Sequence, residues 1–188
     1  MDPFPTTEAR WFLRGSIPAA AAAWFEALGA PVEPESRTDR YLRPTSDGLG
    51  VKVREGSLET KRREDRLGPL GAGASAGAVE SWVKWSFDLA APADPETGWV
   101  AVGKTRRQRQ RRVAGGVCSL ELAEVTAGGE TWWSVCLEAF GRTAGARRDA
   151  LDAAARAWLD RPDAPALPAE ASMGYAAWLM GLPAPPPR

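Results

Sequence analysis

The segment Gly50–Arg63 constrains the fold more than any other part of the chain, because charged and less polar side chains alternate along two consecutive extended runs. Lys52 and Arg54 stand at every second position of the first run, and Glu59 and Lys61 do so in the second. Successive side chains of a strand point to opposite faces, so each run predicts a strand with one charged face. The short glycine-containing connection between the runs suits a hairpin.

The same placement of charge recurs in later strand-like segments. Lys84 lies in one of them, Lys104 and Arg106 lie in another, and Glu121 and Glu138 lie in two more. A β-sandwich would turn such faces to water, and in that case Glu121 and Glu138 would form cross-strand salt bridges with lysines. Alternatively, many strands with one charged face each can line the inside of a barrel. A lumen rich in lysine and arginine would suit a polyanion.

Composition excludes several classes of function. At 188 residues the chain fits one domain with a terminal appendage. Lys plus Arg and Asp plus Glu number 24 each, so bulk charge predicts neither a nucleic-acid nor a membrane partner. No apolar run approaches the roughly 20 residues that span a bilayer, and a cytoplasmic location is the default expectation. The chain has no histidine, which excludes Ser-His-Asp and Cys-His catalysis and histidine metal ligands.

The two cysteines, Cys118 and Cys136, lie in neighbouring strand-like runs. In a cytosolic chain we expect reduced thiols packed as small apolar groups. Two cysteines without histidine make a poor zinc site.

Patterns along the chain predict about eight strands and two or three helices. Strands are expected over residues 8–14, 36–43, the two arms of 50–63, 79–89, 99–107, 117–126 and 130–141. Helices are expected from about 18 to 28, from 146 to 159, and as a short docking helix within 171–180. The glycine- and alanine-rich stretch 67–78 reads as a flexible connection, 90–98 as a loop, and the basic run 106–112 as a solvated hairpin tip.

Six motifs, in this order, resemble those of the CYTH superfamily, the triphosphate tunnel proteins. They are Leu28-Gly29-Ala30, Asp39-Arg40-Tyr41-Leu42, Val51-Lys52-Val53-Arg54, Leu58-Glu59-Thr60-Lys61, Lys104-Thr105-Arg106 and the run Val135–Phe140. The superfamily includes thiamine triphosphatases, inorganic triphosphatases and class IV adenylyl cyclases. The resemblance covers about residues 8–159 and implies an α+β fold that is mainly antiparallel β, an approximately eight-stranded tunnel-type barrel with packed helices. It implies a tunnel domain over 1–160 and a Pro-rich C-terminal extension over 161–188.

The resemblance also implies a ligand and a set of site residues. The ligand would be a triphosphate-bearing compound, and a divalent metal, Mg²⁺ or Mn²⁺, would bind with it. Arginine supplies bidentate geometry to phosphate and lysine a point charge. The candidate phosphate ligands are Lys52, Arg54, Lys61, Lys84, Lys104 and Arg106, and the candidate metal carboxylates are Glu8, Glu121 and Glu138. No catalytic residue is predicted.

Two departures from the superfamily pattern separate the functional hypotheses. The family's first strand carries Glu-x-Glu-x-Lys, but here Arg10 stands in place of the second glutamate and Phe12 in place of the lysine. Phe140 replaces the second glutamate of the closing Glu-x-Glu. A carboxylate replaced by Arg10 reverses the local charge and should weaken divalent-ion binding. One hypothesis is therefore triphosphate binding with metal-dependent hydrolysis. The second is a non-catalytic module that sequesters or senses a nucleotide or polyphosphate, and a third is an RNA- or protein-binding domain that uses the basic run.

Overall fold

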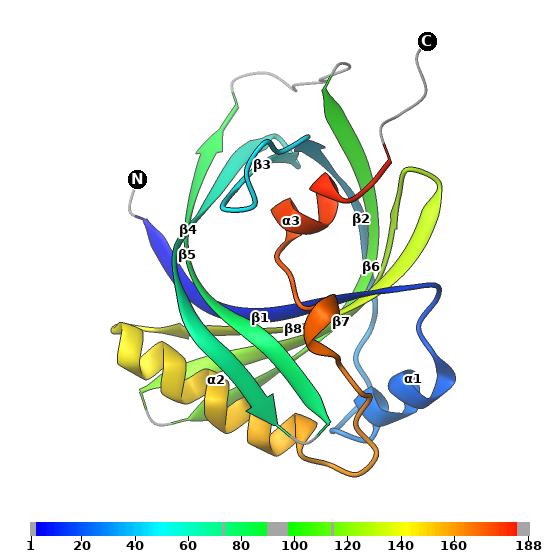
Figure 1. Ribbon diagram of the computed structural model, residues 1–188, viewed down its shortest axis with the longest axis vertical. Coiled ribbons are helices and arrows are strands. Elements are labelled where there is room, and N and C mark those ends of the chain that lie inside the picture. The colour runs from blue at the N-terminus through cyan, green and yellow to red at the C-terminus, as the bar shows by residue number, and fades with distance from the viewer. Residues whose placement is uncertain (1–2, 73, 90–97, 114, 184–188) are drawn as a thin grey trace.

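Eight antiparallel strands close into a barrel in the computed structural model, which describes residues 3–72, 74–89, 98–113 and 115–183 (Figure 1). Around the barrel the strands follow the order β1-β5-β4-β3-β2-β6-β7-β8. Their bounds are Phe4–Arg14 (β1), Glu35–Leu42 (β2), Leu49–Arg54 (β3), Ser57–Ala72 (β4), Ser75–Asp88 (β5), Trp99–Val113 (β6), Gly116–Ala127 (β7) and Glu130–Gly141 (β8). The predicted fold class, a mainly antiparallel α+β barrel with packed helices, is confirmed.

Three α-helices complete the described part of the chain: α1 (Ala19–Glu26), α2 (Ala144–Leu159) and α3 (Tyr175–Met180). A 3₁₀ turn, η1 (Ala169–Ala171), precedes α3. Helix α1 begins directly after Pro18, and α2 begins directly after its N-cap residue Thr143, whose hydroxyl accepts a hydrogen bond from the Ala146 amide at 3.1 Å. Helix α2 lies across the outside of the barrel (Figure 1). The helices expected near 18–28 and 146–159 are therefore confirmed.

The side chains form two apolar clusters, one on each face of the barrel wall. The larger cluster lies outside the barrel, where Trp11 and Leu120 pack with residues of α1 and α2 such as Trp24 and Leu151. The smaller cluster lies inside, where lumen-facing side chains from β1, β2, β6 and β7 pack against α3. The outer cluster leaves the charged faces of the strands free to point inward.

The C-terminal segment enters the barrel between β1 and β5. The amide of Met173 donates to the Arg10 carbonyl on β1 at 2.9 Å, and the Ala78 amide on β5 donates to the Ser172 hydroxyl at 2.9 Å. Helix α3 then lies inside the ring of strands (Figure 1). Trp178 of α3 stacks on Phe12 with a centroid distance of 4.5 Å and an interplanar angle of 4°. The expected docking helix is present, and the lumen is where it docks.

The expectation of a flexible connection over 67–78 is wrong. Residues 67–72 and 75–78 are the paired ends of β4 and β5, with Pro69 opposite Ala78 and Ala72 opposite Ser75. Arg148 of α2 donates to the Leu67 carbonyl at 2.7 Å and so fixes this ladder from outside. At Gly77 this ladder needs a residue without a side chain, although the composition of the stretch resembles that of a linker.

Gly77 permits the closest of these approaches, and its replacement by alanine is expected to destabilise the fold by about 1–3 kcal/mol. A Cβ at this position would lie 2.8 Å from the Ser172 hydroxyl and would also overlap the Trp11 ring. Gly71, across the ladder on β4, has no atom within 4 Å of such a Cβ, so Gly71→Ala is the matched control. Thermal denaturation with limited proteolysis of the C-terminus tests this. Equal behaviour of the two variants would contradict the packing described.

The basic run 106–112 is also not a hairpin tip, because β6 continues through it to Val113. Arg109 donates to the carbonyls of Phe25 and Ala30, at 3.0 and 2.6 Å, where α1 ends. The loop expected over 90–98 falls almost wholly outside the described residues. Among the described residues, no helix is long and apolar enough to cross a membrane.

Both cysteines are free and buried, which agrees with the expectation of reduced thiols. Cys118 packs in the outer apolar cluster, where burial raises the pKa of its thiol to about 12. Cys136 is opposite the lumen-facing Glu121 in the β7–β8 ladder, so the two thiols point to opposite faces of the sheet. A disulfide between them would require one strand to turn over.

Candidate functional site

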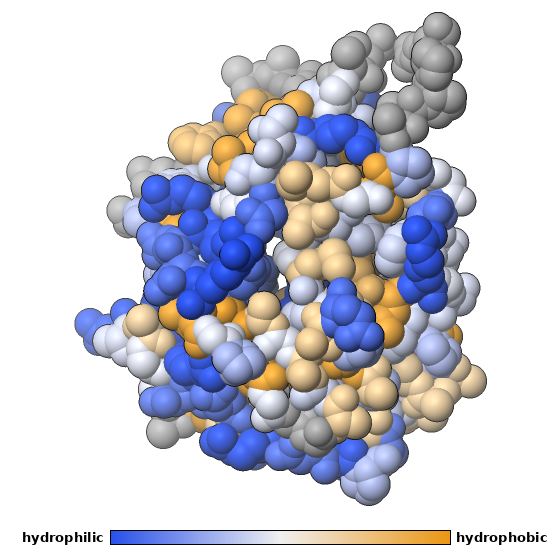
Figure 2. Space-filling model, in the orientation of Figure 1, coloured by the Kyte–Doolittle hydropathy of each residue, from blue (hydrophilic) through white to orange (hydrophobic). Residues whose placement is uncertain are grey.

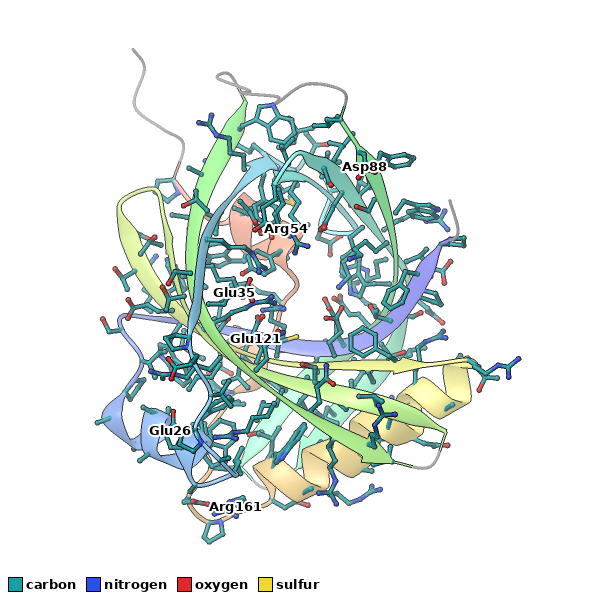
Figure 3. All side chains as sticks on the ribbon, turned by 180° about the vertical axis from the view of Figure 1, so that it is seen from behind. Glu26, Glu35, Arg54, Asp88, Glu121 and Arg161 are labelled. Carbon is teal, nitrogen blue, oxygen red and sulfur yellow. The ribbon has the colours of Figure 1, made fainter. Side chains whose placement is uncertain are left out.

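A polar cavity of about 160 Å³ lies in the lumen beside α3. All six predicted phosphate ligands and all three predicted metal carboxylates line this cavity: Lys52, Arg54, Lys61, Lys84, Lys104, Arg106, Glu8, Glu121 and Glu138. Figure 3 shows Arg54 and Glu121 reaching into the ring of strands from different sides, whereas Glu26 and Arg161 lie outside it. Alternation on separate strands therefore brings these residues together, as the barrel alternative predicts.

Cationic side chains outnumber carboxylates among the residues that line the cavity, although the whole chain is neutral. Eight cationic side chains and four carboxylates line it, an excess of four positive charges, whereas the formal net charge of the chain is +0. The chain has four lysines, and every one of them lines this cavity. Figure 2 shows hydrophilic residues gathered beside the more hydrophobic surface of α3. Burying so many cations is costly unless anions accompany them.

Glu121 of β7 is the counter-charge for one half of the cavity. Its carboxylate accepts from Arg10 at 3.0 Å, from Lys104 at 2.7 Å and from Arg106 at 3.2 Å. Burial alone would raise the pKa of Glu121, but Lys104 and Arg10 outweigh it and hold the pKa well below its usual range. Glu121 is therefore ionised, and both of its oxygens are engaged by side-chain cations.

Lys61 of β4 is the centre of the other half. Its ammonium group lies 2.5 Å from a carboxylate oxygen of Glu8 and 3.2 Å from one of Glu138. Glu8 and Glu138 face each other across the β1–β8 ladder, so Lys61 lies between two neighbouring carboxylates. Burial favours the neutral amine, but Glu138 and Glu8 outweigh burial and raise the pKa of Lys61. The side chain remains 29 % exposed to the cavity.

A third group of ion pairs extends along β2, β3 and β4. Lys52 lies 2.9 Å from Asp39 and 3.3 Å from Glu59, and Glu59 also pairs with Arg54 at 3.2 Å. Asp39 further accepts from Arg37. Burial lowers the pKa of Lys52, and the neighbouring carboxylates only partly offset this effect. Each cation of this group thus has a carboxylate partner, and a bound ligand would have to replace that interaction with one of similar strength.

Aromatic rings from α3 and the strands form part of the cavity wall. Tyr175 stacks on Tyr41 with centroids 5.2 Å apart, and the Arg10 guanidinium lies 4.8 Å from the Tyr175 ring centroid. The Tyr175 hydroxyl is buried and has no hydrogen-bond partner among the described residues. Trp82 donates to Glu80 at 3.1 Å, and its ring lies 5.7 Å from the Lys61 ammonium. These rings hold the cations in place by cation–π contact.

Several lining residues were not predicted as site residues, among them Arg10, Arg37, Glu59 and Tyr175. Glu59 carried the right signal, because it alternates with Lys61 on the same strand face. Arg37 likewise shares a face with Asp39 and Tyr41. Tyr175 had no such signal, because nothing in a short helix of the C-terminal segment indicates that it enters a lumen.

The donor set does not fit a divalent metal ion. Magnesium needs carboxylate oxygens free to coordinate it. Glu8 and Glu138 already hold Lys61 between them, and Glu121 holds three cations. Among the described residues, no group of three or more Asp, Glu, Cys or His side chains is placed to hold a metal. Arg10, on the same face of β1 as Glu8, adds a positive charge beside these carboxylates.

Comparison with known proteins gives little further information. No family model matches the chain, and no curated protein matches its sequence. Among solved structures, the chain is similar to the RNA triphosphatase Pct1 of S. pombe, with 12% sequence identity and a TM-score of 0.41. The similarity covers 85% of this chain and 78% of that one. At this level of similarity the case for function rests on the lumen itself.

Proposed function

We propose that this protein is a divergent CYTH-like tunnel protein that binds a triphosphate-bearing compound in the lumen of its barrel. One observation carries the proposal: in a chain with no net charge, all four lysines line one cavity, and cationic side chains exceed carboxylates by four among the residues that line it. An outward-facing charged surface would need no such separation of charge. The ordered motifs of the tunnel superfamily support the same ligand class.

The ion pairs of the cavity suit exchange with phosphate oxygens. Arg54 and Arg106 each keep part of the side chain exposed, at 29% and 18%, and each pairs with a carboxylate that lines the cavity, Glu59 and Glu121 respectively, at 3.2 Å. A phosphate chain offers oxygen acceptors along its whole length and can bridge cations on several strands at once. The proposed pose places phosphates against Lys52, Arg54 and Lys61 on one side and against Lys104 and Arg106 on the other.

Calorimetric titration of the full chain tests the proposal. Tripolyphosphate, ATP and thiamine triphosphate are expected to bind at least about 100-fold more tightly than orthophosphate, because a longer anion contacts more of the cations. Failure of all three triphosphates to bind, or equal binding of orthophosphate, would contradict the proposal. An RNA oligonucleotide without a 5′ triphosphate separates this function from a nucleic-acid contact made by the basic run.

The second candidate is metal-dependent hydrolysis of the same ligand, favoured by the proximity of Glu8 and Glu138 around Lys61. It would require Lys61 to leave both carboxylates when ligand and metal arrive. Phosphate release from tripolyphosphate, thiamine triphosphate and ATP, with Mg²⁺ or Mn²⁺, compared between wild type and Lys61→Ala, distinguishes the two. We expect binding without turnover, and turnover that is lost in the variant would establish hydrolysis instead.

Binding is expected to weaken as the pH rises through the alkaline range. Burial lowers the pKa of Lys52 and of Lys104 from the ordinary lysine value of 10.5, so these ammonium groups lose their protons earlier than exposed lysines do. A polyanion binds the protonated forms, so affinity falls as the pH rises toward the ordinary lysine value of 10.5, and it falls earlier than exposed lysines would require. Calorimetric titrations at increasing pH measure the pH dependence of the affinity. Repeating them in two buffers of different ionisation enthalpy measures the accompanying proton uptake. An affinity that stays constant up to pH 10.5 would contradict the placement of these lysines.

A further inference from the structure

Side-chain cations occupy the places in the lumen where a divalent ion would have to bind. The Arg10 guanidinium lies 3.0 Å from a Glu121 oxygen and the Lys104 ammonium lies 2.7 Å from the same oxygen. On the other side, the Lys61 ammonium lies 2.5 Å from Glu8 and 3.2 Å from Glu138. A metal ion could reach these carboxylates only by displacing side chains that are themselves held by burial.

Burial and neighbouring side chains hold two of these cations, Arg10 and Lys104, in position. Arg10 is 8% exposed and its guanidinium is held between the Glu121 carboxylate and the Tyr175 ring. Lys104 is also 8% exposed, and its ammonium lies 5.5 Å from the centroid of the same ring. Side chains held in this way are preorganised for an anion and need no metal to supply the positive charge.

We propose that the lumen binds its polyanion in the free form, without a divalent metal, and that Mg²⁺ weakens the binding. This inference rests on the proposed function of triphosphate binding. Arg10 and Lys61 would supply the positive charge that a metal supplies elsewhere. Magnesium prefers phosphate oxygens, so it removes negative charge from the ligand in solution. The magnesium complex then offers less charge to the cations of the cavity and brings a like-charged ion close to Arg10 and Lys61.

Titration calorimetry of the full chain with tripolyphosphate, in EDTA and in saturating MgCl₂, tests the inference. NaCl is used to match ionic strength, because salt alone screens such binding. The expected result is an affinity at least about 10-fold higher in EDTA than in MgCl₂. Equal affinity, or tighter binding with Mg²⁺, would overturn the inference and leave the proposed function intact. Absence of binding in both conditions would overturn the proposed function as well.

Arg10→Glu sharpens the test, because it places a second carboxylate two residues from Glu8 on the same strand face. We expect this variant to lose metal-free affinity and to bind more tightly with Mg²⁺ than without it, the reverse of wild type. Arg10→Gln, which removes the charge without adding a carboxylate, should lose metal-free affinity and gain no magnesium dependence. Arg14→Glu is the matched control on β1, since Arg14 is 66% exposed outside the cavity. Circular dichroism and a melting curve establish that each variant folds. Wild-type affinity of either Arg10 variant in EDTA would contradict the role given to Arg10.

Discussion

Replacing Lys61 with alanine is expected to weaken tripolyphosphate binding by at least about 100-fold. A charge-assisted hydrogen bond contributes about 1.5–3 kcal/mol, and about 1.4 kcal/mol corresponds to a factor of ten in affinity. The variant also leaves Glu8 and Glu138 facing the ligand without the ammonium that lies 2.5 and 3.2 Å from them. Repulsion between these carboxylates and the phosphates adds to the loss. Titration calorimetry measures the affinity directly.

The same substitution should also destabilise the fold, because breaking a buried ion pair from one side costs about 3–5 kcal/mol. Combining Lys61→Met with Glu8→Gln removes one charge of each sign and is expected to recover most of that stability without recovering binding. Arg62→Ala is the matched control on β4, since the Arg62 side chain is 60% exposed. Binding within a factor of three of wild type in the Lys61→Ala variant would show that Lys61 does not contact the ligand.

Replacing Glu121 with glutamine is expected to destabilise the protein by about 3–5 kcal/mol, because three cations then lose their common buried counter-charge. These cations are Arg10, Lys104 and Arg106, at 3.0, 2.7 and 3.2 Å. Tripolyphosphate binding should be retained, because the variant adds one positive charge to the cavity. Loss of stability with retained binding distinguishes this position from Lys61. Denaturant unfolding with and without ligand measures both quantities.

Acid titration gives a second readout for Glu121. Its pKa is lower in the folded protein than in the unfolded chain. The stability that it contributes is therefore present above the unfolded-state pKa of about 4.3 and is lost as the pH falls toward the lower folded-state pKa. Wild type should lose stability below about pH 4 more steeply than Glu121→Gln. Glu124→Gln, on the opposite face of β7, should stay within about 0.5 kcal/mol of wild type. Identical acid profiles for wild type and Glu121→Gln would contradict the ion-pair network.

Strand alternation predicted the strands and their charged faces, and the resemblance to the tunnel superfamily favoured a barrel over a sandwich. The local alternation places Lys52, Arg54 and Lys61 on one face of a hairpin. Closure of the sheet into a barrel then turns that face inward. The predicted strand over 99–107 stopped too early, because arginines such as Arg109 read as a solvated tip. Their strand is stabilised by tertiary contacts with α1 that local composition does not encode.

The features that sequence patterns missed depend on contacts between distant parts of the chain. The ladder around Gly77 packs closely against Trp11 and Ser172 because Gly77 has no side chain. From composition alone, the same glycine predicts a flexible segment. Tyr175 reaches the lumen because the chain passes between β1 and β5. Arg10 was recognised as a departure from the superfamily pattern, but only the structure places it against Glu121. The division of the chain at residue 160 stays a prediction.

The central claim is that the lumen is the binding site, and lysine NMR tests it most directly. Because all four lysines of the chain line the cavity, protein labelled with ¹³C at the lysine ε carbons gives signals from the lumen alone. Addition of tripolyphosphate should shift the signals of Lys52, Lys61, Lys84 and Lys104, with the largest change at Lys61. Binding seen by calorimetry that leaves all four signals in place would put the ligand on the outer surface and contradict this account.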